Sequence, residues 1–189
     1  MLLRNKRPLV LNAKQLRSYS PLAVSHLLKA KSQKRNAIYI VLDNVLDTYN
    51  IGSIFRLADA VAAKKIYLCG GTETPPNPRI KKASINTTEW VEWSYKESAI
   101  EAINDIRLTI NDIQIVAIEQ SKNSVQYDQF EYTLPICLIV GNESEGVSKE
   151  VLKMADGIVE LPMFGVNKSL NVMVSLGIVL YEVIEKTKS

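Results

Sequence analysis

The sequence predicts a single α/β domain built on a mostly parallel sheet with helices on both faces. Short β-branched runs of strand length alternate with segments that place apolar residues at helical spacing. This alternation is typical of βαβ units, whose crossover helices cover a parallel sheet. The 189 residues, 47% hydrophobic and 23% charged, are sufficient to bury one core.

Five apolar runs are expected to form buried strands: Ile38–Leu42, Lys65–Cys69, Ile113–Glu119, Ile136–Val140 and Ile158–Leu161. Two helices are expected between them, because their apolar residues share one helical face: Ile54, Leu57, Ala58 and Val61 in the first, and Ala99, Ile103, Ile106 and Ile110 in the second. Ser148 is expected to cap a short helix over Lys149–Ala155. The last helix, about Leu170–Lys186, is apolar almost all round and is expected to be buried on most sides.

Charge is distributed unevenly along the chain. Residues 1–35 hold nine Lys and Arg and no acidic residue, so the net charge of +3 combines a +9 arm with a body of −6. Ser20 followed by Pro21 predicts a short helix over Leu22–Lys31 in this arm. We therefore divide the chain into a basic arm, residues 1–35, and a domain over residues 36–189. The arm favours a polyanionic partner, although a solvated basic terminus without a partner fits the composition too.

The longest segment without periodicity is Gly70–Thr88, which holds three prolines followed by Arg79, Lys81 and Lys82. It predicts a long loop with a positive patch, which is either functional or simply solvated.

Several classes of protein are disfavoured by what the chain lacks. Cys69 and Cys137 lie in strand-like runs and His26 is the only histidine, so no metal site or disulfide framework is expected. No apolar leader follows Met1, and Leu170–Ile184 is too short to span a bilayer. We expect a cytoplasmic protein with two free thiols.

Three polar segments follow predicted strands, where ligands bind in open parallel sheets. Familiar nucleotide motifs do not fit them. No G-x-G-x-x-G follows the first strand, and although Gly141 and Gly146 have the spacing of a P-loop, Val147 replaces its lysine. Glu143 and Glu145 would also repel phosphates.

Nucleophilic catalysis is equally hard to support, since no histidine is placed to activate Ser169. Each polar residue also has a purely structural interpretation. Asn50 and Asn171 could be turn or cap residues, Ser169 an N-cap, and Arg56 with Glu143 a salt bridge. Together they could hold a polar ligand and orient a hydroxyl.

Taken jointly, the three segments resemble the three motifs of the SPOUT superfamily, in its SpoU/TrmH-type branch of RNA ribose 2′-O-methyltransferases. They are Asn50–Arg56 (NIGSIFR), Ile139–Gly146 (IVGNESEG), and Leu161–Met163 (LPM) with Ser169–Val172 (SLNV) and Gly177-Ile178. The resemblance extends over about Ile38–Lys186. Its departures are mild and spare the polar residues: Leu57, Leu161 and Met173 stand where other residues are usual.

The resemblance implies a C-terminal deep trefoil knot, an obligate homodimer, S-adenosylmethionine as cofactor without a metal, and tRNA or rRNA as substrate. By position, the implied catalytic set is Asn50, Arg56, Glu143, Ser169 and Asn171. The implied cofactor-binding residues are Gly141, Leu161, Met163 and Leu170. We expect RNA phosphates to contact the arm and the 70–88 segment through Arg4, Lys6, Arg7, Arg17, Arg79, Lys81 and Lys82.

Arg56 is the residue that the family resemblance offers for activating the ribose 2′-hydroxyl. Since arginine is almost always protonated, we favour a positioning role over that of a free base. Glu143 would favour the cationic cofactor or fix Arg56. Two alternatives stay open: a non-catalytic RNA-binding protein with the same knotted fold, and an ordinary nucleotide-dependent α/β enzyme. Which RNA and which nucleotide are modified does not follow from the sequence.

Overall fold

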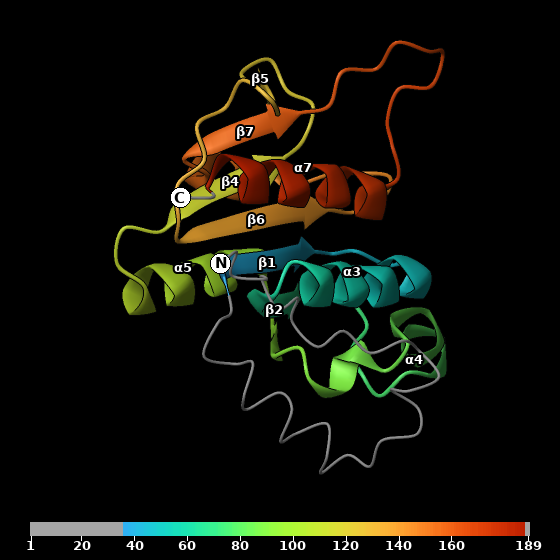
Figure 1. The fold of residues 1–189 in the computed structure, drawn as a ribbon. Helices are drawn as coiled ribbons and strands as arrows, with labels where there is room; N and C mark the ends of the chain where they lie inside the picture. The colour runs from blue at the N-terminus through green and yellow to red at the C-terminus, as the bar shows by residue number, and fades with distance from the viewer. Residues whose placement is uncertain (1–35, 188–189) are drawn as a thin grey trace, which may run out of the picture. The chain divides into compact units, whose positions relative to one another are not determined.

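A seven-stranded sheet forms the centre of the protein, as a computed structural model describing residues 36–187 shows (Figure 1). Its strands are β1 (Asn36–Asp43), β2 (Ala63–Cys69), β3 (Trp93–Lys96), β4 (Gln114–Ile118), β5 (Val125–Gln126), β6 (Ile136–Gly141) and β7 (Gly157–Glu160). They lie in the order β3-β2-β1-β6-β4-β7-β5, and every neighbouring pair is parallel. The predicted parallel α/β sheet is confirmed.

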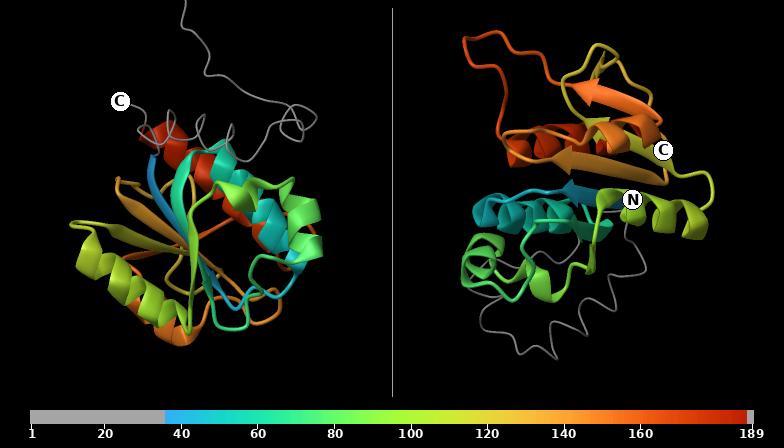
Figure 2. Two further views of the ribbon diagram at one scale, coloured as in Figure 1. Left: turned by 90° about the horizontal axis from the view of Figure 1, so that it is seen from below. Right: turned by 180° about the vertical axis from the view of Figure 1, so that it is seen from behind.

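Helices cover both faces of this sheet (Figure 2). They are α3 (Thr48–Ala60), α4 (Pro78–Ser84), the 3₁₀ turn η1 (Thr87–Glu89), α5 (Ala99–Thr109), α6 (Lys149–Met154) and α7 (Val172–Lys186). α3 and α7 pack on one face and α5 and α6 on the other. Alternation along β1 divides the core accordingly: Ile38, Ile40 and Leu42 face the α3 side, and Val41 faces the α5 side. None of the helices in residues 36–187 is long and apolar enough to cross a membrane.

The Gly70–Thr88 segment is not the continuous loop that its composition predicts. α4 and the start of η1 lie within it. The Asn77 side chain caps α4 by accepting hydrogen bonds from the backbone N–H groups of Arg79 and Ile80, and Pro78 takes the first helical position. The prolines therefore mark a helix start here, because proline's fixed φ suits the first turn. Ile80 is fully buried and anchors the helix.

The structure adds two strands to the five expected and does not contain one expected helix cap. β3 and β5 are short strands at the two edges of the sheet, and their sequences carry no apolar run. Ser148 does precede α6, but its side chain makes no capping bond; its backbone N–H instead donates to Asp43 Oδ2 at 2.9 Å.

α7 is buried on one side only within the described part of the chain. Leu176, Val179 and Val183 face the core, whereas Val174 and Tyr181 are exposed. The expectation of burial on most sides is therefore wrong for the isolated chain, because α7 forms the outer layer of its face.

The carboxyl ends of β1, β4, β6 and β7 meet along one edge of the sheet, and the loops that follow them converge there. The arm, with its expected helix and with Arg4, Lys6, Arg7 and Arg17, lies outside the described residues.

Candidate active site

A chain of side-chain hydrogen bonds joins the three polar segments. Asn50 lies in the first turn of α3 and is only 6% exposed. Its Nδ2 donates to Glu143 Oε1 at 3.0 Å, and its Oδ1 accepts from Asn171 Nδ2 at 3.0 Å. Asn171 caps α7, because its Oδ1 accepts from the N–H of Met173 at 3.0 Å. The buried Asn50 amide thus connects the loop after β6 to the start of α7.

Glu143 is held by the start of α3 on both carboxylate oxygens. Oε2 accepts the N–H of Leu46 at 3.1 Å, and Oε1 accepts the N–H of Asp47 at 3.0 Å as well as the Asn50 amide. Partial burial opposes ionisation of Glu143, but these three donors outweigh it and hold its pKa below the ordinary value. Glu143 is therefore an ionised anchor and a poor proton acceptor.

The turn after β6 depends on two glycines and a carboxylate from β4. Gly141 approaches the backbone of Gly146 so closely that a Cβ there would collide with it. Gly146 has a φ of +74°, and a Cβ on it would collide with Glu119 Oε2. That oxygen accepts the Val147 N–H at 2.8 Å. Glu119, directly after β4, thus stabilises the turn through a hydrogen bond to its backbone.

Asn142 organises the same turn from within. Its Oδ1 accepts the N–H groups of Ser144 and Glu145 at 2.8 and 3.1 Å, and its Nδ2 donates to the Asn44 carbonyl at 3.0 Å. The loop after β6 is consequently tied to the end of β1.

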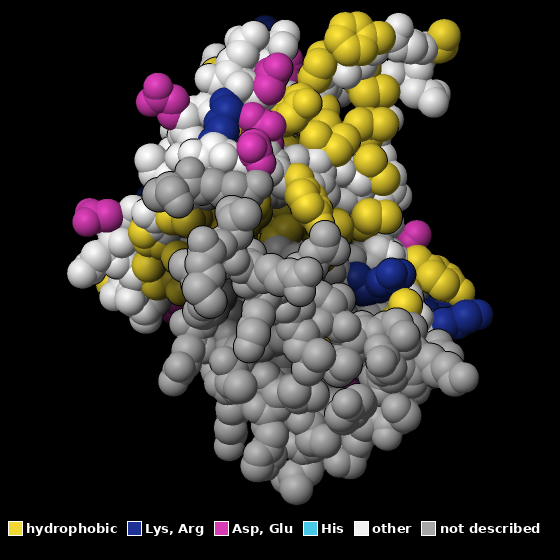
Figure 3. Space-filling model, viewed as in Figure 1, with side chains coloured by type: hydrophobic (Ala, Val, Ile, Leu, Met, Phe, Trp, Pro, Cys, Tyr) yellow, Lys and Arg dark blue, Asp and Glu magenta, His cyan; other side chains and the backbone are white. Residues whose placement is uncertain are grey.

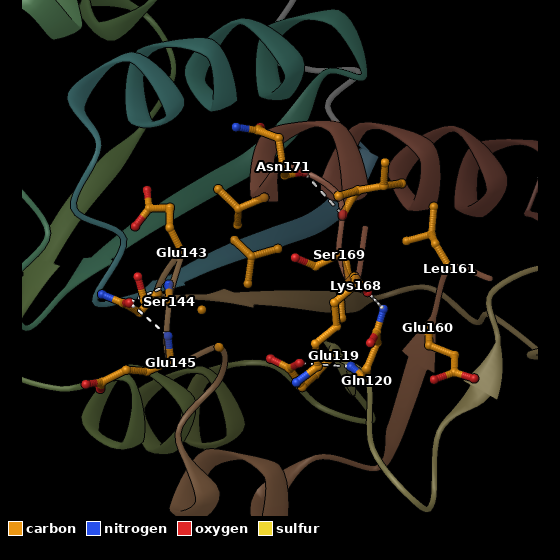
Figure 4. Close-up of a pocket in the computed structure, with 18 of the residues that line it drawn as sticks. Glu119, Gln120, Glu143, Ser144, Glu145, Glu160, Leu161, Lys168, Ser169 and Asn171 are labelled. Atoms are coloured by element: carbon orange, nitrogen blue, oxygen red, sulfur yellow. Dashed lines mark hydrogen bonds between the residues drawn. The ribbon is translucent and has the colours of Figure 1, made fainter. Parts of the chain in front are cut away.

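A cavity of about 490 Å³ lies between this turn, the end of β4 and the segment 161–171. Its size suits a small-molecule ligand. The walls include seven of the residues that the sequence singles out: Gly141, Glu143, Leu161, Met163, Ser169, Leu170 and Asn171. Figure 4 shows Glu143 and Glu145 on one side of the cavity and Glu160 and Leu161 on the other. Gln120 Nε2 donates to the Lys168 carbonyl at 2.8 Å and fastens the 161–171 segment to the end of β4.

The cavity is strongly acidic for its size. Glu119, Glu143, Glu145 and Glu160 line it against the single cation Lys168. Carboxylates around a partly enclosed space favour a ligand that carries positive charge. These walls fit the sulfonium cofactor that the sequence resemblance implies.

Arg56 stands apart from this network. It lies two turns along α3 from Tyr49, is exposed, and forms no hydrogen bond or ion pair with any residue of the described range 36–187. The expectation that Glu143 fixes it, and the alternative of an Arg56–Glu143 salt bridge, are both wrong. The carboxylate is occupied by donors from residues 46, 47 and 50.

The basic residues of the 70–88 segment are exposed on α4. Lys81 is paired with Glu89 at 3.7 Å, whereas Arg79 and Lys82 form no ion pair within the described chain. α4 lies tightly on α3 at Gly52, where a Cβ would be 2.6 Å from Ala83 Cβ. This contact places the α4 cations on the same layer as Arg56, one helical turn from Gly52.

Sequence reasoning did not find Glu119, Asn142, Glu160 or Lys168. Glu119 carries a signal that could have found it, because it directly follows a predicted strand whose neighbours also end in polar segments. The other three lie inside or beside the motifs, but only the structure shows that they line the same cavity.

The sequence matches one family model, described as the SpoU rRNA Methylase family, over residues 37–181. Among similar proteins, a tRNA (guanosine(18)-2′-O)-methyltransferase of Aquifex aeolicus is 34% identical over 163 residues, covering 84% of this chain and 74% of its own length. The protein of the same description from Escherichia coli K12 is 26% identical, covering 86% of this chain and 69% of its own length.

Comparison with solved structures leads to the same family. The A. aeolicus TrmH/SpoU tRNA modifying enzyme superposes with a TM-score of 0.74 at 30% identity, covering 86% of this chain and 83% of that one. The SpoU methyltransferase AviRb from Streptomyces viridochromogenes, in complex with AdoMet, also gives 0.74, at 25% identity over 83% of this chain and 63% of that one.

Proposed function

Because this chain belongs to the SpoU rRNA methylase family, we propose that its acidic cavity is where a methyl group passes to the ribose 2′-hydroxyl of a tRNA or rRNA nucleotide. The chain is an S-adenosylmethionine-dependent RNA 2′-O-methyltransferase. The observation that carries the location of the site is the bonded series Glu143–Asn50–Asn171, which unites all three motifs beside the cavity that Glu143 and Asn171 line.

S-adenosylmethionine, when bound, supplies an electrophilic methyl group on a sulfonium. The carboxylates around the cavity favour that positive charge, and the turn 141–147, whose close packing requires glycine at 141 and 146, forms part of the cavity wall. Leu161, Met163 and Leu170 contribute apolar wall. We assign cofactor binding to Gly141, Leu161, Met163 and Leu170.

Arg56 is the group that we propose positions the RNA. It is exposed and free of partners in the described chain, so its guanidinium is available for a phosphate and for the hydroxyl beside it. The saturated, ionised Glu143 is not a base for the hydroxyl proton. Catalysis then depends on orientation, which can supply several kcal/mol of a barrier, about 7–11 at best. Ser169, at the cavity wall, and Asn50 with Asn171 maintain that geometry.

The RNA is expected to reach this site by electrostatic attraction. Arg79 and Lys82 on α4, and the basic arm, would contact phosphates without reading sequence. RNA affinity should fall steeply with added salt, and deletion of residues 1–35 should reduce that dependence. Unchanged affinity and salt slope after the deletion would remove the arm from the docking surface.

Transfer of labelled methyl groups to total RNA from cells lacking this gene tests the activity. Ribose methylation in the product is then mapped to a nucleotide. Arg56→Ala should lower transfer by about 100-fold or more, because a misplaced substrate costs that much, while calorimetric binding of S-adenosylmethionine stays unchanged. Lys64→Ala is the matched control, since Lys64 is an exposed cation at the amino end of β2, whereas the site lies at the carboxyl ends of the strands. No transfer by the unmodified protein would favour the non-catalytic RNA-binding alternative.

We also propose that the protein is a homodimer through α7 and the 161–171 segment. Figure 3 shows hydrophobic side chains in a nearly continuous band on this face. Phe164, Val166 and Leu170 are exposed in the segment, and Val174 and Tyr181, the latter 57% exposed, continue the band along α7. A second copy of the chain would bury this face, which is too apolar to stay in water without cost.

Light scattering measures the oligomeric state directly. Tyr181→Arg should convert the dimer to a monomer, whereas Leu108→Arg, at an exposed leucine on the opposite face, should not. A dimer that survives a charge at Tyr181 would place the interface elsewhere. We further propose that the C-terminal segment forms the family's deep trefoil knot and that the reaction is cytoplasmic, where RNA is processed and both buried cysteines stay free thiols.

A further inference from the structure

The first turn of α3 carries an aromatic ring that the fold does not use. The Tyr49 side chain is 52% exposed and makes no hydrogen bond, ring contact or cation–π contact with any residue between 36 and 187. Only its backbone participates locally, since its N–H donates to Asp47 Oδ1 at 2.7 Å. The side chain could therefore be removed without loss of the helix cap.

Tyr49 belongs to the same helix turn as a residue of the proposed site. Its neighbour in the chain, Asn50, bonds Glu143 and Asn171. Seven residues further along α3, and thus on the same helical face, is Arg56, which has no ion-pair partner among residues 36–187. Figure 3 shows hydrophobic and cationic side chains next to one another over the α3 and α4 region of the surface. The face accordingly combines a ring with a free guanidinium.

An aromatic ring beside a free cation is the chemistry by which proteins hold unpaired RNA. Bases stack on aromatic side chains, and arginine contacts the adjoining phosphate. A duplex displays its 2′-hydroxyls in a shallow minor groove, whereas a hydroxyl that has to reach into a cavity of about 490 Å³ is presented more freely by an unpaired segment. The base next to it then loses a stacking partner, which a ring at position 49 can replace.

We propose that Tyr49 is a stacking platform for an unpaired base adjoining the target nucleotide, so that this enzyme selects ribose hydroxyls in loops or single strands over those in duplexes. The inference rests on the proposed methyl transfer and specifies which RNA the same site accepts. Tyr49 would contact the base while Arg56 holds the phosphate.

Steady-state methyl transfer to total RNA from cells lacking this gene tests the platform. Tyr49→Ala should raise KM for RNA by roughly 5- to 150-fold, the range found when a stacking aromatic is removed, with little change in kcat and none in cofactor binding. Tyr49→Phe and Tyr49→Trp should keep KM close to that of the unmodified enzyme, because both retain a ring. Leu108→Ala serves as the control for loss of an exposed apolar side chain.

The outcomes separate the two proposals. Absence of transfer by the unmodified enzyme contradicts the proposed function itself. If Tyr49→Ala transfers methyl groups with an unchanged KM for RNA, the stacking role of Tyr49 is wrong but the proposed function stands. If Tyr49→Ala is no longer a dimer, Tyr49 is an interface residue and the stacking role is again wrong. The mapped nucleotide gives an independent check: a target within a continuous duplex contradicts the inference, and an unpaired target supports it.

Discussion

Replacing Asn50 by alanine should uncouple the three motifs while leaving the helix intact. The substitution removes a hydrogen bond to the ionised Glu143 and a neutral one from Asn171. Hydrogen bonds to charged groups contribute about 1.5–3 kcal/mol and neutral ones about 0.5–1.5 kcal/mol. Since Glu143 is largely exposed, its bond belongs at the lower end, and the free energy of unfolding should fall by about 2–3 kcal/mol.

A double-mutant cycle isolates the interaction itself. Urea unfolding of the original protein, Asn50→Ala, Glu143→Ala and the double variant, at one protein concentration, should give a coupling energy of about 1–1.5 kcal/mol. Asn104→Ala, at an exposed position of α5 whose side chain makes no hydrogen bond within residues 36–187, should change stability by less than about 0.5 kcal/mol. A coupling energy below about 0.5 kcal/mol, the size of ordinary non-additivity between distant sites, would show that the bonded series does not hold the site together.

Further predictions concern the stability of the protein at low pH and the substitution of individual glycines. The lowered pKa of Glu143 means that its ionised form stabilises the fold above its ordinary pKa of 4.5, and that this contribution is lost as pH falls through the folded-state pKa. Thermal unfolding should therefore show Glu143→Gln less stable than the original protein at neutral pH, with the difference vanishing in acid; a constant difference would exclude the titration. Gly146→Ala should lower the free energy of unfolding by about 2–3 kcal/mol, because alanine is strained at a left-handed φ and its Cβ would displace Glu119. The same substitution should weaken cofactor binding measured by calorimetry. Gly165→Ala is the control and should leave both unchanged, because a Cβ there would meet nothing within 4 Å. Gly52→Ala should lower the free energy of unfolding, because the added Cβ forces α4 away from α3 and this cost exceeds the gain of about 1 kcal/mol in helix propensity. Gly177→Ala should instead raise the free energy of unfolding, because its Cβ would meet only Leu57 at 3.4 Å. Equal effects of the two substitutions in urea unfolding would contradict the close α3–α4 contact.

The long buried elements could be predicted from the sequence because their residues satisfy one strong pattern. β1 and β6 are continuous apolar runs, and α3 and α5 repeat apolar residues on one face. β5 could not be predicted, since Val125 and Gln126 are exposed and pair only with the neighbouring strand β7. Its strand conformation comes from tertiary pairing rather than from burial.

The site illustrates the same division. The sequence motifs placed Asn50, Glu143 and Asn171 in one group. Which of these side chains hydrogen-bond to one another depends on the register between β1 and β6, in which Asp43 pairs with Gly141, and the sequence does not show that register. Arg56 belonged to the group by motif, yet its side chain projects away from the network, since its neighbours in α3 are fixed by burial of Ile54 and Phe55. The half-buried α7 could not be anticipated, because apolarity does not say whether a helix meets its own core or a second chain.

The four glutamates of the cavity have a consequence for turnover. Methyl donation converts a sulfonium to an uncharged thioether, so the product of the reaction differs from the incoming cofactor by one full positive charge. An acidic chamber discriminates between two such molecules of almost equal shape by charge alone, favouring the one that enters over the one that must leave. If the cofactor occupies this cavity as we propose, the same carboxylates would repel the RNA backbone and favour exchange of the spent cofactor, and added salt should slow that exchange by screening the charge difference.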